Sequence, residues 1–287
     1  MDENMTIAIT GATGALGGIV AELLSDTGLS LRLIVRDPSR APALPDAVVA
    51  VASYDDRGAS LEALRGITTL FMVSAKESPD RLLQHRIFIE AARDAGVQHM
   101  VYTSFAGAAP DATFTFARDH FETEIYLQNS GMDYTILRDN FYMDVTPYFP
   151  GTDGVIRGPA GTGRAATVAR ADVAAAATAV LRAPDAHVNR IYEMTGPEAL
   201  SLIDVAHMLS KALSRNITFQ SESIEEAYKS RAHYGAEAWE VDAWVSTYTA
   251  IAADEMSTVS RDVEILTGRP PRSLAELLSG TNQGINS

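Results

Sequence analysis

The chain contains no cysteine among its 287 residues. This absence excludes disulfide bonds, thiolate nucleophiles and metal sites with cysteine ligands. Long apolar runs are absent too, since none approaches the roughly 18 residues of a membrane-spanning helix. Acidic residues and then a predicted strand stand at the start, in place of a secretory signal. We therefore expect a cytoplasmic protein without a membrane anchor, and no metal site.

Basic residues are scarce in this chain. Its 23 lysines and arginines stand against 37 aspartates and glutamates, which gives a formal net charge of −14. A protein with this excess of negative charge is repelled by nucleic-acid backbones and by anionic membranes. We therefore expect a small-molecule ligand, and neither nucleic acid nor membrane as a partner.

Lysine is rarer still, because only Lys76, Lys211 and Lys229 occur. Reductases of the short-chain type usually carry a tyrosine four residues before a lysine on a helix, where the lysine lowers the pKa of the tyrosine for proton transfer. None of the three lysines follows a tyrosine at that spacing. The sequence disfavours an ordinary ketoreductase mechanism, and it weakens an isomerase or epimerase mechanism built on the same pair.

The most informative segment that is present runs from Thr10 to Gly17 and reads TGATGALG. Residues Met5–Ile9 before it have the β-branched, apolar composition of a buried strand, and the apolar residues after it recur at helical spacing. A glycine-rich turn between a strand and a helix is typical of a dinucleotide site, because the helix N-terminus directs unpaired N–H groups toward phosphate.

Each glycine of this loop has a physical role. Gly11 permits a tight turn, Gly14 lets the backbone approach a pyrophosphate, and Gly17 lets the helix pack close to the sheet. The spacing GxxGxxG differs from the GxGxxG of common dehydrogenases. The sequence predicts dinucleotide binding, and the alternative is a glycine-rich turn without a ligand.

The second predicted strand, Leu31–Arg36, ends in a basic residue. NAD-binding folds usually place an acid near this point, where it holds the ribose 2′-hydroxyl. Arg36 favours the 2′-phosphate of NADP instead, because a guanidinium binds phosphate through two parallel hydrogen bonds. In the alternative, Arg36 is solvated and Asp37 holds the ribose of NAD.

Strands and helices alternate along the first half, which predicts an α/β fold of the Rossmann type with a doubly wound parallel sheet. Further strands are expected at Leu31–Arg36, Val48–Ala52, Thr69–Ser74, His99–Ser104 and Tyr134–Arg138. Helices are expected at Gly14–Ser25, Arg57–Leu64, Arg81–Ala95 and Phe116–Asn129. Because ligands of such sheets bind at the carboxyl ends of the strands, the loops after Ile9, Arg36, Ser74, Ser104 and Arg138 should form the site.

The pattern loosens after Arg138. A segment rich in proline and glycine is followed by an alanine-rich helix at Ala165–Ala183, a strand at Arg190–Met194 and a capping box at Ser201–Asp204. We therefore divide the chain into a cofactor-binding domain, 1–145, whose sheet later segments complete, and a smaller α/β substrate-binding lobe, 146–287.

His120 and Glu124 stand one turn apart on the fourth predicted helix and share a face. In one interpretation, His120 reaches the nicotinamide ribose or the substrate and Glu124 orients it. In the other, the two residues form a solvated pair at the start of a helix. A metal site is disfavoured because a third ligand is missing nearby.

Six further stretches point to a family when they are taken in order with the glycine loop. LIVRDPSR, VYTS, HFETE, YTILRDNFY, TVARADVAAAA and TGRPPRSLAELL cover most of the chain at characteristic separations. The sequence resembles the NmrA-like atypical short-chain reductases, and most closely their branch of NADPH-dependent quinone oxidoreductases and triphenylmethane reductases.

The resemblance implies bound NADPH and assigns roles to residues. The implied cofactor contacts are Gly11, Ala12, Thr13, Gly14, Ala15, Leu16, Gly17, Arg36, Ser74, Ala75, Lys76, Thr103, Ser104, Asp139, Asn140, Phe141, Tyr142 and Arg170. The acceptor is expected over the nicotinamide, against Phe105, Tyr142 and Met143. Tyr142 and His120 are the candidate catalytic residues, Tyr142 and Asn140 for positioning and His120 for optional proton supply.

Two positions depart from the family pattern. Ser53 stands where relatives often carry an acid after the third strand, and Asp139 replaces the more usual asparagine or proline after the arginine. The first weakens an expected adenine contact. The second leaves the details of the 139–144 loop open.

These observations predict an NADPH-dependent oxidoreductase that transfers hydride to a quinone-like acceptor without a Tyr-Lys pair. Such an acceptor takes hydride directly, and its oxyanion can take a proton from water or a nearby hydroxyl, so catalysis rests on proximity and orientation. The alternative is a non-catalytic NAD(P)-binding redox sensor of the NmrA type. A homodimer is a further expectation, because dimers are common among closed assemblies.

Overall fold

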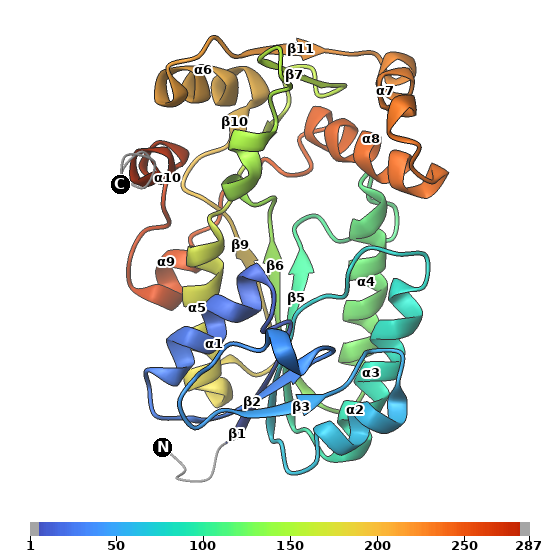
Figure 1. The fold of residues 1–287 in the computed structure, drawn as a ribbon, viewed down its shortest axis with the longest axis vertical. Helices are drawn as coiled ribbons and strands as arrows, with labels where there is room; N and C mark the ends of the chain where they lie inside the picture. Colours follow the sequence, from blue (N-terminus) through green and yellow to red (C-terminus); the bar gives the residue numbers. More distant parts are fainter. Residues whose placement is uncertain (1–5, 282–287) are drawn as a thin grey trace. The chain divides into compact units, whose positions relative to one another are not determined.

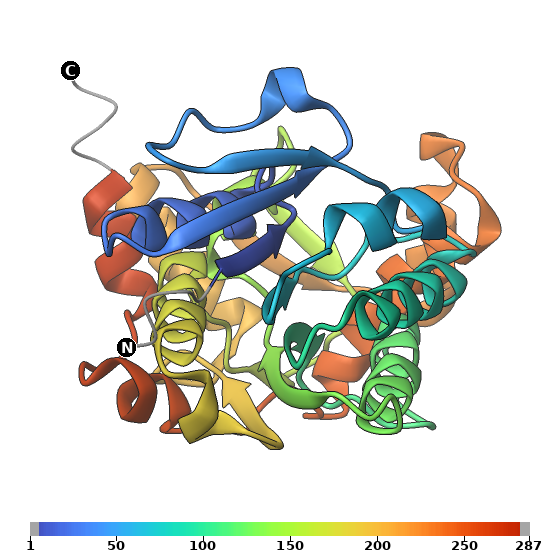
Figure 2. The same cartoon turned by 90° about the horizontal axis from the view of Figure 1, so that it is seen from below.

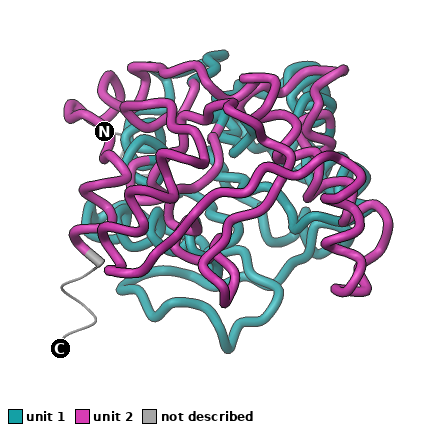
Figure 3. Tube along the Cα trace, turned by 90° about the horizontal axis from the view of Figure 1, so that it is seen from above, with its two compact units in different colours: residues 1–105, 119–138, 173–192 teal, residues 106–118, 139–172, 193–287 magenta. Residues whose placement is uncertain are grey.

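The computed structural model describes residues 6–281, so the predicted first residue of strand one, Met5, lies outside the described residues. The chain forms two compact units that alternate along the sequence (Figure 3). Unit 1 comprises residues 1–105, 119–138 and 173–192, and unit 2 comprises residues 106–118, 139–172 and 193–287.

Unit 1 is built on a seven-stranded sheet with the strand order β3-β2-β1-β4-β5-β6-β9 (Figure 1). The strands are β1 (Thr6–Thr10), β2 (Ser30–Val35), β3 (Val48–Val51), β4 (Thr69–Met72), β5 (His99–Phe105), β6 (Asp133–Asp139) and β9 (Arg190–Met194). β1 pairs in parallel with β2 and β4, β2 with β3, and β4 with β5. The order reverses at β1, as in a doubly wound sheet, and the prediction of a Rossmann-type fold is confirmed.

Helices cover both faces of this sheet (Figure 2). They are α1 (Ala15–Ser25), α2 (Arg57–Ala63), α3 (Arg81–Ala95), α4 (Thr115–Gln128) and α5 (Arg170–Arg182). α4 from Asp119 onward and α5 from Val173 onward belong to unit 1. α1 and α5 lie on one face, and α2, α3 and α4 lie on the other.

The central strands form where short apolar runs can be buried on both faces, whereas the edge strand β3 is largely exposed. All four residues of β4 are buried, and the apolar side chains of β1 are fully enclosed. Phe88 and Ile89 of α3 and Tyr102 of β5 belong to the largest fully buried side chains of this core. Their burial removes apolar surface from water, which is the dominant stabilising term in such a core.

Unit 2 contains short strands and mostly short helices. They are the 3₁₀ helix η2 (Met143–Tyr148), β7 (Val155–Gly158), β8 (Arg164–Ala165), β10 (Leu200–Ser201), α6 (Leu202–Leu213), β11 (Thr218–Ser221), α7 (Ile224–Arg231), α8 (Ala238–Ala252), α9 (Asp262–Thr267) and α10 (Leu274–Thr281). β8 pairs with β10 in antiparallel fashion, and β7 pairs with β11 in parallel.

The predicted capping box is confirmed, and the predicted start of the alanine-rich helix is wrong. Ser201 accepts from the N–H of Asp204 while the Asp204 carboxylate accepts from the N–H of Ser201. The alanine-rich helix starts at Arg170 instead of Ala165. Residues before Arg170 pair in extended conformation, Arg164–Ala165 with Leu200–Ser201 and Val168 with Tyr142. These tertiary pairings override the helical propensity of alanine.

Candidate functional site

The glycine loop of unit 1 connects β1 directly to α1 (Figure 1). Gly11 adopts a φ of 65°, which favours glycine, and the N–H of Gly14 closes the turn on the carbonyl of Gly11 at 2.8 Å. Gly14 caps α1 without a side chain, so the first N–H groups of the helix are left for a ligand. Gly11, Gly14 and Ala15 are exposed, while Ala12, Leu16 and Gly17 face the interior and Thr13 is half-buried.

Gly17 sets how closely α1 approaches the end of β1. A Cβ atom at this position would lie 2.4 Å from the carbonyl oxygen of Gly11 and 2.9 Å from that of Thr10. Both distances are well below van der Waals contact. The backbone geometry therefore leaves no room for a side chain at Gly17, in agreement with the packing role predicted for it.

Tyr54, which is partly buried, forms hydrogen bonds next to this loop. The Tyr54 hydroxyl lies 2.5 Å from Oγ1 of Thr10 and 2.6 Å from the carbonyl oxygen of Val73. Thr10 in turn accepts from the N–H of Val73 at 2.9 Å. Burial raises the pKa of Tyr54 above its ordinary value, so the phenol stays neutral. These bonds join the carboxyl ends of β1 and β4 to the segment after β3.

Arg36 follows β2 directly and is exposed. Its neighbour Asp37 caps a 3₁₀ helix, η1 (Pro38–Arg40), by accepting from the N–H and the hydroxyl of Ser39. These hydrogen bonds lower the pKa of Asp37, first through the Ser39 side chain. Both bonds go to Oδ1 of Asp37, and the side chains of Arg36 and Asp37 are both exposed. The contact of Arg36 with the ribose end of a cofactor stays a prediction.

The loop Ser74–Lys76 after β4 is held through its backbone. Ser74 donates its N–H to Oγ1 of Thr103, and Ala75 donates its N–H to Nε2 of His85, at 2.9 and 2.8 Å. Lys76 is exposed. Thr103 thus acts beneath the loop, and the structure adds His85, which the sequence prediction missed.

His85 is fully buried in α3, and its neighbours define its tautomer. Nε2 accepts from Ala75, so Nδ1 carries the hydrogen and donates to Oγ1 of Thr123 at 2.9 Å. Burial lowers the pKa of His85 to about 3, and the charge of Arg81 acts in the same direction. His85 is therefore a neutral group that positions the Ser74–Lys76 loop.

His120 is likewise enclosed. Arg81 Nη2 donates to Nε2 of His120, and Nδ1 lies 2.9 Å from the hydroxyl of Tyr102. Burial, followed by the charge of Arg81, places the pKa of His120 well below its ordinary value. The alternative of a solvated pair with Glu124 is wrong, because the two residues are only 5% and 1% exposed. The catalytic role of His120 stays a prediction.

Glu124 is bound by residues other than His120. Arg138 contacts both carboxylate oxygens, at 2.9 and 2.7 Å, and the Ser104 hydroxyl donates to Oε1 at 2.5 Å. A bidentate arginine compensates a buried carboxylate through two parallel bonds. The side chain of Ser104 is thus bound within unit 1, where it fixes the end of β5, and Phe105 follows half-buried.

Unit 2 holds the other predicted site residues around the segment that follows β6. Asn140 is buried and ties the backbone together, since its amide donates to the carbonyl of Met256 and its oxygen accepts from the N–H of Phe141. Met143 is buried and donates its N–H to the carbonyl of Val168. Val168 in turn donates its N–H to the carbonyl of Phe141, so residues 141–143 are held against Val168.

Tyr142 stands in a group of charged side chains within unit 2. Its hydroxyl donates to Oδ2 of Asp139 at 2.5 Å, and the Arg170 guanidinium lies over its ring at 4.9 Å from the centroid. The backbone N–H of Arg170 donates to Oδ2 of Asp144 at 2.9 Å, which fixes the first residue of α5. The structure therefore brings Asp139, Tyr142 and Arg170 together, as residues of one predicted site should be.

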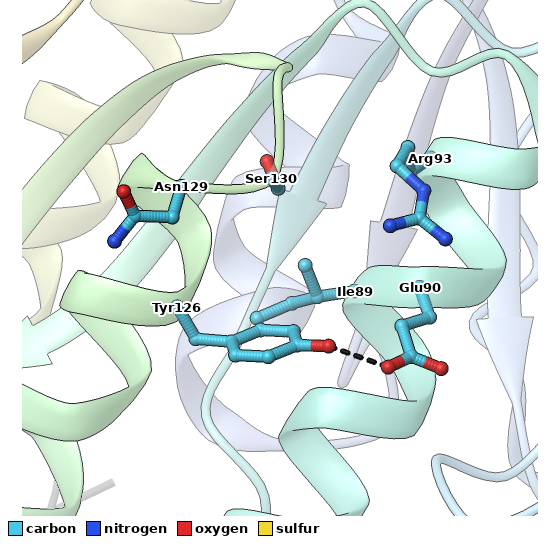
Figure 4. Close-up of a pocket in the computed structure, with 6 residues that line it drawn as sticks. All are labelled: Ile89, Glu90, Arg93, Tyr126, Asn129 and Ser130. Atoms are coloured by element: carbon cyan, nitrogen blue, oxygen red, sulfur yellow. Dashed lines mark hydrogen bonds between the residues drawn. The ribbon is translucent and has the colours of Figure 1, made fainter.

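A small pocket lies elsewhere in unit 1, on α3 and α4 (Figure 4). It measures about 110 Å³ and is lined by Ile89, Glu90, Arg93, Tyr126, Asn129 and Ser130. The hydroxyl of Tyr126 donates to Glu90 across it. Ligand sites usually exceed about 300 Å³, so this surface pocket is no candidate for a dinucleotide or its acceptor.

Comparison with known proteins places these loops in a family. A family of NAD(P)H-binding proteins matches residues 11–184. The chain belongs to this NAD(P)H-binding family. An NAD(P)H azoreductase from Xenophilus azovorans is 32% identical over 275 residues, which cover 94% of this chain and 96% of the relative.

Solved structures agree with the family. An NADPH-dependent quinone oxidoreductase from Escherichia coli, complexed with NADPH, is 34% identical, covers 96% of this chain and 99% of its own, and superposes with a TM-score of 0.88. The triphenylmethane reductase of a Citrobacter species, complexed with NADP(H), is 28% identical over 96% of this chain and 99% of its own, with a TM-score of 0.84. The predictions of an NmrA-like reductase family, NAD(P) binding and an NAD(P)H-dependent oxidoreductase are confirmed.

Within residues 6–281, no helix of this NAD(P)H-binding protein combines the length and the apolar composition needed to cross a bilayer.

The neutral state of His85 leads to a prediction about acid stability. Below a pH of about 6.5 the unfolded chain protonates this histidine, whereas the folded protein does so only near pH 3. Between about pH 6.5 and pH 3 the unfolded state binds more protons, so within this window the histidine lowers the free energy of unfolding by about 1.4 kcal/mol for each unit that the pH falls. In NMR spectra of the folded protein, the His85 imidazole shifts should stay constant between pH 5 and 7.5.

The same resonances should titrate near pH 6.5 once urea has unfolded the chain. A folded-state titration of His85 above pH 5 would show that the ring is not enclosed as the geometry indicates.

Proposed function

We propose that this chain is an NADPH-dependent reductase that transfers hydride to a quinone-like acceptor. One observation carries the proposal: the glycine loop at the end of β1 stands beside an exposed Arg36 at the end of β2, while Asp37 is engaged with Ser39. A pyrophosphate needs the first feature, and a 2′-phosphate needs the second.

The residues of the loop fit NADPH. No side chain projects from Gly11 or Gly14 toward the exposed side, and the N–H groups at the start of α1 are left for phosphate. Gly11 to Gly17 would bind the pyrophosphate, and Arg36 the 2′-phosphate. Ser74 to Lys76, Asp139 to Tyr142 and Arg170 would contact the nicotinamide half.

Bound NADPH supplies a hydride from C4 of its nicotinamide. The chain's own residues then orient the acceptor and provide a proton. Phe105, Tyr142 and Met143 are the proposed acceptor contacts, and Tyr142 is the proposed hydroxyl donor because it is half-buried and belongs to the charged group of unit 2. His120, with both ring nitrogens engaged, would act indirectly.

The names of the relatives support a planar, conjugated acceptor. They include a quinone oxidoreductase, an azoreductase and a triphenylmethane reductase. Each of these acceptor classes has a delocalised π system that takes hydride without prior activation by an acid. This chemistry agrees with a chain in which no lysine follows a tyrosine by four residues.

We keep the functional division of the chain as part of the proposal. Residues 1–145 provide most of the cofactor contacts, and residues 146–287 contribute the acceptor lobe. We also propose a cytoplasmic homodimer, which light scattering of the purified protein would test.

A cofactor assay tests this function. We expect oxidation of NADPH, followed by its absorbance, to depend on an added quinone and to exceed oxidation of NADH. An azo dye should serve as a second acceptor, because hydride transfer needs only a planar, electron-poor system. His120→Ala should retain part of the turnover at saturating quinone, and fully unchanged turnover would remove His120 from the mechanism.

The acceptor-free reaction is the control. Tight binding of both cofactors without turnover on any acceptor would contradict the proposal and would favour a redox sensor, which the same glycine loop can serve.

A further inference from the structure

The carboxyl group of Asp139 occupies an unusual place in unit 2. Asp139 ends β6 and is 4% exposed. Its Oδ2 accepts one hydrogen bond, from the hydroxyl of Tyr142 at 2.5 Å. Its Oδ1 is buried and has no hydrogen-bond partner among the described residues. An ionised carboxylate with a buried, unpaired oxygen is costly, because desolvation is not compensated.

The charged groups around Asp139 and Tyr142 do not supply the missing compensation. From the start of α5, the Arg170 guanidinium lies over the face of the Tyr142 ring, while the backbone N–H of Arg170 donates to Asp144, which comes from η2. Other segments contribute main-chain groups here: Ala106 donates to the carbonyl of Asp139, and Met194 accepts from the N–H of Asn140. The arginine therefore faces the tyrosine, and among the described residues no cationic side chain pairs with the aspartate.

Protonation removes this cost. Burial raises the pKa of Asp139 to about 7, against the opposing effect of the hydrogen bond from Tyr142. Burial also raises the pKa of Tyr142 well above its ordinary value, with the Asp139 charge acting in the same direction. The tyrosine therefore releases a proton only when another proton replaces it.

We propose that protonated Asp139 is a positioning residue that donates its hydrogen to the hydroxyl oxygen of Tyr142 and so turns the Tyr142 hydrogen toward the acceptor. When Asp139 is ionised, the single hydrogen of Tyr142 points at the carboxylate and is withheld from the acceptor. The Asp139–Tyr142 pair is thus a proton relay that works in its acid form. This inference rests on the proposed function.

Atoms, electrons and charge balance in this relay when the acceptor is a quinone. Hydride from NADPH brings two electrons and one proton, and the product is a hydroquinone monoanion. The O–H bond of Tyr142 breaks as its proton moves to the product oxygen, and the O–H bond of Asp139 breaks as its proton moves to the tyrosine oxygen. The product leaves as the neutral hydroquinone, and water reprotonates the Asp139 carboxylate before the next turnover.

The pH dependence of kcat tests the relay. With NADPH and a quinone at saturation, wild-type kcat should be level below pH 6 and fall about tenfold per pH unit above pH 7, as one proton is lost. Asp139→Asn keeps the size and the hydrogen bond to Tyr142, and removes the titrating proton. Its kcat should be independent of pH and about tenfold or more below wild type at pH 6. Tyr142→Phe should also lose the inflection, with kcat lowered about a hundredfold.

A second measurement does not need turnover. In protein labelled with ¹³C at the aspartate carboxyl groups, one resonance should titrate near pH 7 and should be missing from Asp139→Asn. Retention of that resonance in the variant, or its titration below pH 5, would overturn the proposal, as would an Asp139→Asn profile with the wild-type inflection. Absence of turnover in wild type would instead defeat the proposed function, and with it the relay, even where the carboxyl resonance titrates as expected.

Discussion

Replacement of Arg36 by glutamine should raise the KM for NADPH about 10- to 100-fold and change the KM for NADH less than about twofold. Hydrogen bonds to charged groups contribute about 1.5–3 kcal/mol each, and NADH has no 2′-phosphate to lose them. Arg36 is exposed at the end of β2, so the substitution removes the charge without disturbing the core. Steady-state kinetics with both cofactors measure the effect.

Arg65→Gln is the matched control, since it removes the charge of another exposed arginine of unit 1, which pairs with Glu62. It should leave both KM values unchanged. If Arg36→Gln raises the KM for NADPH and for NADH equally, the guanidinium does not discriminate between the cofactors. Asp37 would then be the residue that holds the ribose.

Gly17→Ala should weaken NADPH binding at least about a hundredfold and lower the free energy of unfolding by about 1–3 kcal/mol. The added methyl group would lie 2.4 Å from the carbonyl oxygen of Gly11 and 2.6 Å from its carbon. Backbone atoms cannot yield as the end of a flexible side chain can, so α1 must move away from β1 and carry the phosphate-binding N–H groups with it. Calorimetric titration and urea unfolding measure the two effects.

Gly18→Ala separates this clash from the general effect of alanine in a helix. Position 18 lies in the same helix, and its new methyl group would come no closer than 3.3 Å, to the carbonyl of Ala12. We expect its stability to change by less than about 1 kcal/mol, because the helical propensity of alanine offsets the tighter contact. Similar losses of NADPH affinity and of stability in both variants would show that alanine in the helix, and not the close contact with the loop, causes the effect.

Features that depend on neighbouring residues could be predicted from the sequence. Gly11, Gly14 and Gly17 follow a strand pattern and precede a helix pattern, so the turn between them is set by local chemistry. Arg36 could be found because the end of β2 lies at a known distance after such a loop. The capping box at Ser201 is equally local.

The polar groups beneath these loops could not be predicted, because their partners are distant in sequence. Tyr54 contacts Thr10 across 44 residues, and Arg81 contacts His120 across 39. The one local signal is the spacing of Arg81 and His85, which stand one turn apart on the same helix as the buried Phe88 and Ile89. The solvated interpretation of His120 was wrong for the same reason, since the chain around it gives no indication of what covers it.

Asp139 and Tyr142 are an intermediate case. They are three residues apart, and the family resemblance assigns both of them to the site. The sequence does not show why an aspartate here would behave differently from an asparagine. That difference depends on the burial of Asp139 and on the single hydrogen bond to its carboxyl group. Desolvation depends on the residues that the fold packs around a group, so it cannot be predicted from the neighbouring sequence.

The late position of β9 in the sequence affects how the sheet can form while the chain is being synthesised. This strand joins the sheet next to β6, but about fifty residues of chain separate the two, and much of that chain belongs to unit 2. During synthesis, β6 emerges first and its outer edge stays open until residues 190–194 leave the ribosome. An open edge can pair with a neighbouring nascent chain. A fragment that stops before residue 190 would retain the glycine loop and Arg36 but keep this edge permanently unpaired.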